Sequence, residues 1–118
     1  MGTTATDRQE IVVREILPKD AEAVAELSGQ LGYAATASEV KDRIEGMLPL
    51  QSNHLVLVAC NGDETIGWIE AETVHHLQSP AHTLITGLVV SEGARSLGIG
   101  KRLCLEVERW SLGRGVPI

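Results

Sequence analysis

Aromatic residues are scarce in this 118-residue chain, which has no phenylalanine and only three aromatic side chains, Tyr33, Trp68 and Trp110. Proteins that hold single-stranded nucleic acid stack its bases on such side chains. Basic residues are also outnumbered, with 10 Lys and Arg against 16 Asp and Glu and a formal net charge of -6. Because nucleic-acid backbones are bound through a surplus of positive charge, nucleic acid is not an expected partner.

Cysteines and long apolar runs are equally few. Cys60 and Cys104 lie far apart, with no metal-binding or redox spacing around either, so we expect two buried thiols in a reducing compartment. No apolar run approaches the length of a bilayer, and Met1–Glu10 lacks the basic start and apolar stretch of a secretory signal. We therefore expect a cytoplasmic protein with no membrane partner, in which a disordered lead-in at 1–10 precedes one domain at 11–118.

Apolar periodicity and turn residues divide that domain into seven segments. They are a strand at 11–17, helices at 20–31 and 36–48, strands at 55–59, 65–74 and 82–90, and a helix at 98–113. Asp20 is positioned to cap the first helix and Gly32 to end it, while Thr36 and Glu39 form a capping box for the second. The order predicts an α/β fold, with a mixed, mostly antiparallel sheet flanked by helices.

The last predicted strand and helix are joined by a loop with two glycines, Gly98 and Gly100. Backbone N–H groups in the first turn of a helix have no partner within the helix and can bind an anion, which glycine allows to approach closely. Arg95, Lys101 and Arg102 add positive charge here, and cations at a helix N-terminus are unfavourable unless an anion compensates them. The loop therefore predicts a bound phosphate group.

Three kinds of phosphate-binding loop compete for this pattern. A Walker A loop needs glycine where the chain has Arg95, and Ser or Thr where it has Arg102, so nucleotide hydrolysis of that type is excluded. A dinucleotide-binding loop needs a third glycine where the chain has Leu103, and an acidic residue about twenty residues further on. That alternative is weak.

The third kind is the acetyl-CoA motif of the GNAT superfamily of N-acetyltransferases, which the chain resembles. That motif is Arg or Gln, two residues, Gly, any residue, then Gly or Ala, and the chain has Arg95-Ser96-Leu97-Gly98-Ile99-Gly100. The resemblance extends over the whole chain, because the family begins with the same strand, two helices, three antiparallel strands, loop and helix. It implies an acyl-CoA N-acyltransferase-like fold with acetyl-CoA as co-substrate.

The resemblance also implies roles for individual residues. The strand residues Leu88, Val89 and Val90 would pair through their backbone with the pantetheine arm, and Arg95 would close the loop. The pyrophosphate would be held by the backbone amides of Ser96, Leu97, Gly98, Ile99, Gly100 and Lys101. A backbone N–H near Val90 would stabilise the oxyanion. The acceptor would be an amine on a small molecule or a protein, attacking acetyl-CoA directly.

Glu70 and Glu72 are the candidate general bases, since they share one strand face near the expected cleft. Alternate polar residues on a strand also commonly face solvent, so this assignment stays open. His75, His76 and His82 match no ligand spacing, and we expect no metal.

Gly115-Val116-Pro117-Ile118 is typical of the approach to another strand, and in the resembling family further strands, a helix and commonly a tyrosine acid follow. We therefore expect the domain to be incomplete at its C-terminus. Alternatives to an active enzyme are an acetyl-CoA-binding module or a fragment without transfer activity. The oligomeric state, with a homodimer as one alternative, is left open.

Overall fold

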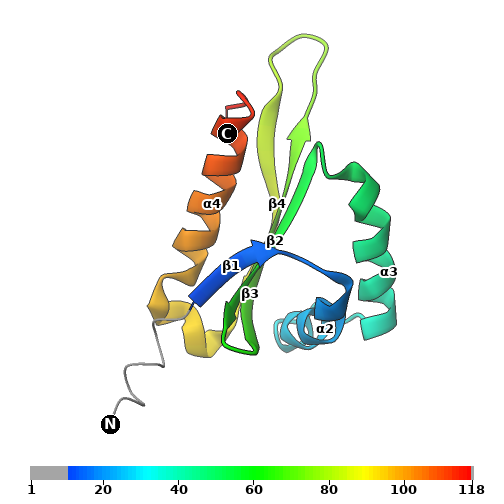
Figure 1. Ribbon diagram of the computed structural model, residues 1–118, viewed down its shortest axis with the longest axis vertical. Helices are drawn as coiled ribbons and strands as arrows, with labels where there is room; N and C mark the ends of the chain where they lie inside the picture. The colour runs from blue at the N-terminus through cyan, green and yellow to red at the C-terminus, as the bar shows by residue number, and fades with distance from the viewer. Residues whose placement is uncertain (1–10, 118) are drawn as a thin grey trace.

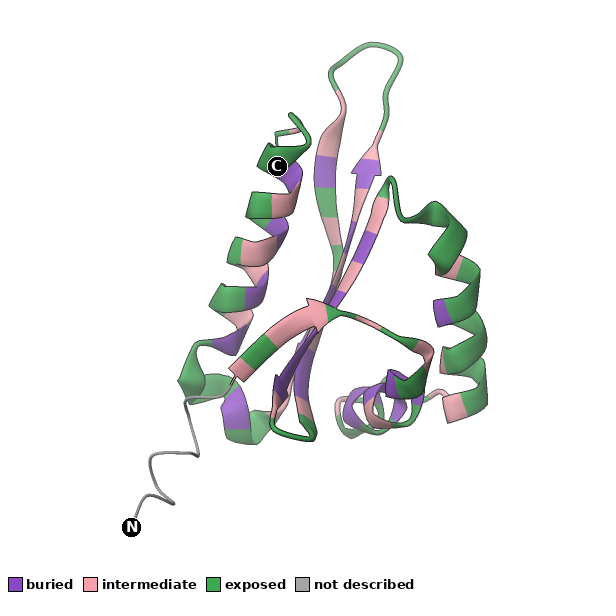
Figure 2. Cartoon of the chain, in the orientation of Figure 1, coloured by how far each residue is buried: buried purple, intermediate pink, exposed green. Residues whose placement is uncertain are grey.

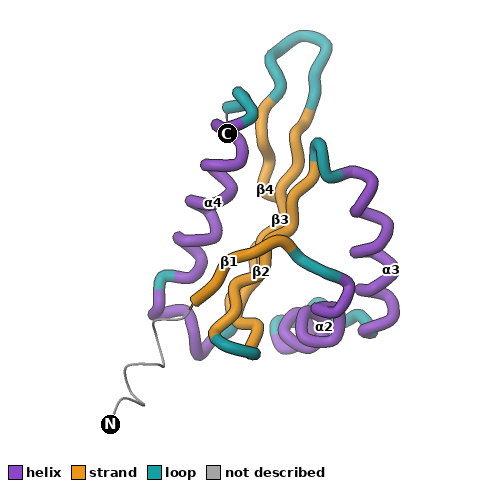
Figure 3. Tube along the Cα trace, viewed as in Figure 1, coloured by secondary structure: helices purple, strands orange, loops and turns teal. Residues whose placement is uncertain are grey.

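The computed structural model describes residues 11–117. Within them the chain forms an antiparallel sheet in the order β1-β2-β3-β4, flanked by α-helices (Figure 1, Figure 3). The strands are β1 (Ile11–Glu15), β2 (His54–Asn61), β3 (Glu64–Val74) and β4 (His82–Val90). The helices are α2 (Ala21–Gln30), α3 (Ala37–Met47) and α4 (Ile99–Gly113), with short 3-10 turns η1 (Pro18–Asp20), η2 (Leu48–Leu50) and η3 (Glu92–Leu97). The predicted fold class and element order are confirmed; the lead-in predicted at 1–10 lies outside the described residues.

Helices cover both faces of the sheet. Figure 1 shows α4 along one face and α2 with α3 along the other. Facing α4 is the larger apolar core, made of Leu55, Leu57, Ala59, Ile66, Ile69, Ala71, Ala94, Ile99, Leu103 and Val107. Facing α2 and α3 is a smaller core, made of Val24, Val58 and Cys60. In Figure 2 the buried positions of α4 follow the side of the helix that faces the sheet.

The continuous apolar run of β2 serves both cores. Successive side chains of a strand point to opposite faces, so Leu57 and Ala59 pack toward α4 while Val58 and Cys60 pack toward α2. The Cys60 thiol is buried, as predicted, whereas Cys104 on α4 is only half-buried. Burial on both faces places β2 at the centre of the domain.

Asp20 corrects one prediction about the first helix. Its side chain makes no capping hydrogen bond to α2. Instead its carboxylate accepts two hydrogen bonds of 2.8 Å from the Arg14 guanidinium and one of 2.7 Å from Leu17 N. The bend from β1 into α2 therefore rests on an ion pair, and β1 ends at Glu15 rather than at the predicted Leu17.

The other local signals near the helix ends act as predicted. Gly32 has φ 91, and the bonds Tyr33 N to Ser28 O and Gly32 N to Gly29 O close the end of α2. The capping box at the start of α3 has both bonds, from Glu39 N to Thr36 Oγ1 at 3.0 Å and from Thr36 N to Glu39 Oε1 at 2.9 Å.

The last described residues run beside β4. Thr83 N donates to Pro117 O at 2.9 Å, and Ser111 Oγ donates to Val116 O at 2.6 Å. No strand is assigned at 114–117, so the predicted approach to another strand is seen only as this single backbone contact with β4. No helix in the described part of the chain is both long enough and apolar enough to cross a bilayer.

Candidate active site

The predicted phosphate-binding loop joins β4 to α4 and consists of η3 followed by Gly98. Gly98 is left-handed, with φ 72, and is the N-cap of α4 without any side-chain capping bond. The first helical bond recorded there runs from Arg102 N to Gly98 O at 3.0 Å. The N–H groups of Ile99, Gly100 and Lys101 precede it, so the start of α4 offers backbone donors to an anion.

A hollow of about 490 Å³, here called the loop pocket, lies against this turn. Its lining is Leu31, Leu88, Val89, Val90, Arg95, Gly98, Gly100 and Lys101. All but Leu31 were predicted from sequence. Leu31, at the end of α2, carried no functional signal, because only the folded chain brings α2 beside β4.

Three residues predicted for the loop do not line this pocket. Ile99, the first residue of α4, is buried in the core between that helix and the sheet, while Ser96 and Leu97 are exposed. The prediction for these three concerned their backbone amides, which their side-chain positions do not contradict.

The three basic side chains of the loop make different contacts. Arg95 Nε donates to Val90 O at 3.4 Å, which ties the loop to the end of β4, and Lys101 lines the loop pocket. Arg102 points elsewhere and donates to Ile11 O at 2.8 Å. The Arg102 side chain therefore anchors β1 to α4 and does not line the loop pocket, although its charge lies near the start of α4 as predicted.

Glycine on β3 allows the start of α4 to sit this close to the sheet. A Cβ on Gly67 would lie 3.2 Å from Ile99 Cγ2 and 3.0 Å from Val89 O. Such contacts are tighter than packed side chains normally make, so glycine at position 67 lets α4 lie close to β3.

A bulge in β4 decides which of its backbone groups face outward. The register passes from Glu70↔Gly87 to Ala71↔Ile85, leaving Thr86 as an extra residue. Beyond the bulge, Ser91 N donates inward to Ile66 O, so the alternation of the strand turns the N–H and C=O groups of Val90 and Leu88 outward. Among the described strands β4 has no neighbour on that side, and its edge there is open.

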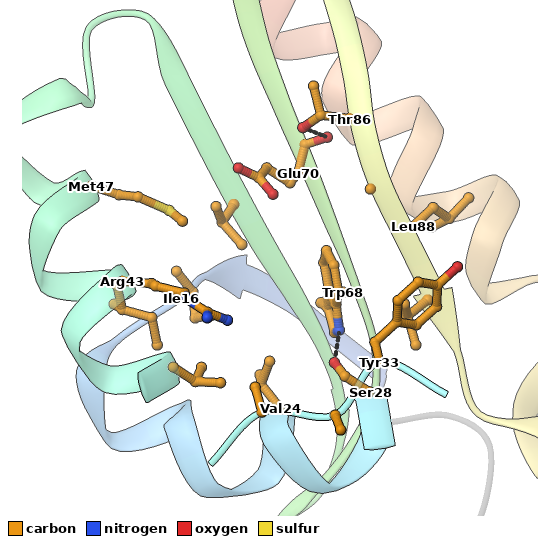
Figure 4. A pocket seen from close by; sticks show the side chains of 17 residues that line it. Ile16, Val24, Ser28, Tyr33, Arg43, Met47, Trp68, Glu70, Thr86 and Leu88 are labelled. Atoms are coloured by element: carbon orange, nitrogen blue, oxygen red, sulfur yellow. Dashed lines mark hydrogen bonds between the residues drawn. The ribbon is translucent and has the colours of Figure 1, made fainter. Parts of the chain in front are cut away.

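A second hollow of about 480 Å³, here called the sheet pocket, lies between the sheet and helices α2 and α3 (Figure 4). Its walls are mainly apolar and include Ile16, Val24, Val40, Ile44, Met47 and Trp68. Trp68 Nε1 donates to Ser28 Oγ at 3.1 Å, and Gly87 leaves room for the indole ring. Leu88 and Val89 line both pockets, so the two hollows meet at the open edge of β4.

Of the two candidate bases, only Glu70 lines the sheet pocket. Its Oε2 lies 2.7 Å from His54 Nε2, and a carboxylate requires a donor, so Nε2 carries the proton when Glu70 is ionised. Glu72 lies further along β3 and lines neither pocket. Sequence reasoning missed His54, because its contact depends on the register of β2 against β3.

His75 and His76 lie in the β3–β4 connection and His82 begins β4, and none of the three lines the loop pocket or the sheet pocket. His76 and His82 stack with their ring centroids 5.1 Å apart across the β3–β4 connection. Within residues 11–117 no group of three or more His, Cys, Asp or Glu side chains is arranged to hold a metal ion.

The geometry agrees with the result of comparison against protein families. The family described as "Acetyltransferase (GNAT) family" matches residues 21–118. The chain belongs to this family. No curated protein matches the GNAT chain closely enough to be counted as a relative.

Solved structures share the fold of this GNAT chain at low sequence identity. A GNAT family acetyltransferase from Staphylococcus aureus is 20% identical, with TM-score 0.78, over 92% of this chain and 82% of that one. Glucosamine-6-phosphate N-acetyltransferase from Arabidopsis thaliana is 18% identical, with TM-score 0.80, over 92% and 78%. An aminoglycoside N-acetyltransferase in complex with CoA is 21% identical, with TM-score 0.74, over 91% and 72%.

Proposed function

We propose that this GNAT chain transfers an acetyl group from acetyl-CoA directly to a primary amine. The observation that carries the proposal is the meeting of the loop pocket and the sheet pocket at Leu88 and Val89. One pocket has the charge and free backbone donors that a pyrophosphate requires, and the other contains a carboxylate suited to an amine. The neighbouring structure in complex with CoA supports the same assignment of the co-substrate.

Acetyl-CoA fits the loop pocket on three counts. Arg95 and Lys101 supply positive charge, and the start of α4 supplies N–H donors. Added Cβ atoms at Gly98 and Gly100 would meet no protein atom closer than 3.8 Å, so the glycines face open space. The outward N–H and C=O groups of Leu88 and Val90 can pair with the amides of the pantetheine arm as a neighbouring strand would.

Glu70 would act as the general base in the sheet pocket. A primary amine is mostly protonated at neutral pH, so a group must remove a proton before nitrogen attacks the thioester carbonyl. The Glu70 carboxylate would accept it, directly or through water, while His54 holds that carboxylate in place. The neutral nitrogen then adds to the thioester carbonyl to form a tetrahedral oxyanion. As that oxyanion collapses the C–S bond breaks, and the second proton on nitrogen passes to the leaving sulfur, so the products are the amide and the free CoA thiol.

Direct attack is supported by the position of the two cysteines of the chain. Cys60 is buried beside Arg14 and Thr65, and Cys104 packs toward the core that faces α4. Neither lines the loop pocket or the sheet pocket, so no thiol is placed to form an acyl-enzyme intermediate.

Release of free CoA thiol tests the proposal. The protein would be mixed with acetyl-CoA and a panel of primary amines, with amine-free hydrolysis subtracted and the amide product identified by mass spectrometry. Thiol release that depends on the amine, with one amide formed per thiol, is expected. Tight acetyl-CoA binding without amine-dependent release from any amine would instead identify a binding module.

A further inference from the structure

The sheet pocket contains a cation that neither the fold nor the proposed transfer step uses. Arg43 of α3 lines the pocket, and Figure 4 shows its guanidinium directed toward Ile16, into the hollow. In the described part of the chain this guanidinium has no hydrogen bond and no ion pair. A hydrogen bond from Thr36 N lowers the pKa of Glu39, one turn earlier on α3, and the nearby charge of Arg43 adds to this without an ion pair between the two side chains. Arg43 is therefore available to a ligand.

On the β3 side of the pocket, the Glu70 carboxylate carries the charge opposite to that of Arg43. Glu70 projects from β3 and is bonded to His54, while Arg43 projects from α3, and the two do not pair with each other. The rest of the lining is mainly apolar and includes Ile44, Met47 and Trp68. The pocket thus presents a carboxylate and a guanidinium among apolar walls.

We propose that the acceptor is an aminocarboxylate with an apolar body, its amine toward Glu70 and its carboxylate toward Arg43. Arg binds a carboxylate through two parallel N–H···O bonds, a geometry that a lone amine cannot use. The apolar walls favour a hydrocarbon body over a polyol. This inference rests on the proposed function, because it names the substrate class of the same pocket.

Matched substrate pairs that differ only by the carboxylate test it. Phenylalanine would be compared with phenethylamine, and 6-aminohexanoate with pentylamine, by kcat/KM at saturating acetyl-CoA. In at least one pair we expect the aminocarboxylate to be favoured by about 10-fold, the effect of one charge-assisted contact at a solvent-accessible site. No preference in either pair would overturn the inference.

Two variants distinguish a direct contact between Arg43 and the carboxylate from a general effect of the positive charge on α3. Arg43→Gln should bring the preference ratio of the favoured pair close to one. Lys41→Gln removes the same charge from an exposed residue of the same helix that lines neither pocket, and it should keep the ratio. Equal loss of preference in both variants, or none in Arg43→Gln, would contradict the assignment.

Binding measurements distinguish this inference from failure of the proposed transfer. If no amine is acetylated, calorimetric titration of the same pairs in the presence of CoA still reports the acceptor preference. Tighter binding of an aminocarboxylate, lost in Arg43→Gln and kept in Lys41→Gln, supports the inference even then. Equal affinities within both pairs reject it, whether or not transfer occurs.

Discussion

The Asp20 carboxylate stabilises the fold through its ion pair with Arg14. Hydrogen bonding from Arg14, together with the Leu17 N–H and nearby positive charge, lowers the pKa of Asp20 below its ordinary value of 3.8 despite burial. The same hydrogen bond raises the pKa of Arg14. The ionised form of Asp20 is therefore the one that stabilises the folded chain.

Replacing Asp20 should make stability depend less on pH. Because its folded pKa is lowered, the contribution of Asp20 is full above about pH 4 and is lost as pH falls toward the folded pKa. Asp20→Asn should lower the free energy of unfolding at pH 7 by about 2 kcal/mol, since Arg14 and Leu17 N lose a charged acceptor. Urea unfolding from pH 7 to pH 3 checks this. A difference between the two proteins that stays constant over this range would contradict the ion-pair role.

Glu70 differs from Glu72 by its place in the sheet pocket, and the pair forms a matched test of the base. Glu70→Gln should reduce amine-dependent kcat by about 100-fold, the typical contribution of a positioned general base. Glu72→Gln removes the same charge two residues along β3, outside both pockets, and should stay within a few-fold of the parent. Similar losses in both variants would show that charge on β3, rather than proton removal by Glu70, matters.

At the scale of elements, α4 joins the core to the loop pocket. Leu103 and Val107 are fully buried against the sheet, and the first turn of the same helix borders the loop pocket. Helix placement and loop geometry are therefore coupled, because the helix cannot shift on the sheet without moving Gly98 and Gly100.

Two leucines on α4 test how that helix packs on the sheet. Leu103 is 0% exposed and Leu105 is 41% exposed. Leu103→Ala should lower the free energy of unfolding by about 3 kcal/mol through the cavity it leaves, whereas Leu105→Ala should change it by less than about 1 kcal/mol. Thermal or urea unfolding of both variants measures the difference. Equal effects would show that α4 does not pack on the sheet as described.

Signals confined to one element could be predicted, whereas those that depend on pairing between elements could not. The capping box at Thr36 and the left-handed Gly32 act within a few residues of themselves, and both were predicted. The bulge at Thr86 has no marker in its own segment, since it arises from the register of β3 against β4. The contact between His54 and Glu70 also spans two strands. Asp20 was expected to cap α2, but its carboxylate instead accepts hydrogen bonds from Arg14 on β1.

At the scale of the whole molecule, the fold brings two separately built hollows to one strand edge. Seven of the predicted loop and strand residues line the loop pocket, because the acetyl-CoA motif is a contiguous stretch whose neighbours in sequence are also neighbours in space. The sheet pocket draws on α2, α3 and three strands, and no contiguous motif marks it. Arg43 could therefore be recognised only in the folded chain.

Acetyl-CoA binding to the loop pocket is the central claim, and Gly100 offers the cleanest test. Gly98 has φ 72, so any substitution there also strains the backbone, whereas a Cβ at Gly100 would make only an ordinary contact, 3.8 Å from Val90 Cγ2. Gly100→Glu would place a carboxylate where the pyrophosphate is expected. Gly46→Glu adds the same charge on α3 at a position with no atom within 4 Å.

Calorimetric titration with acetyl-CoA tests directly whether the loop pocket binds it. The parent protein and Gly46→Glu should bind acetyl-CoA with equal affinity, and Gly100→Glu should bind at least about 100-fold more weakly, because it sets a negative charge against the phosphates and blocks their approach. Undiminished binding by Gly100→Glu, or no binding by the parent protein, would contradict the assignment of the loop.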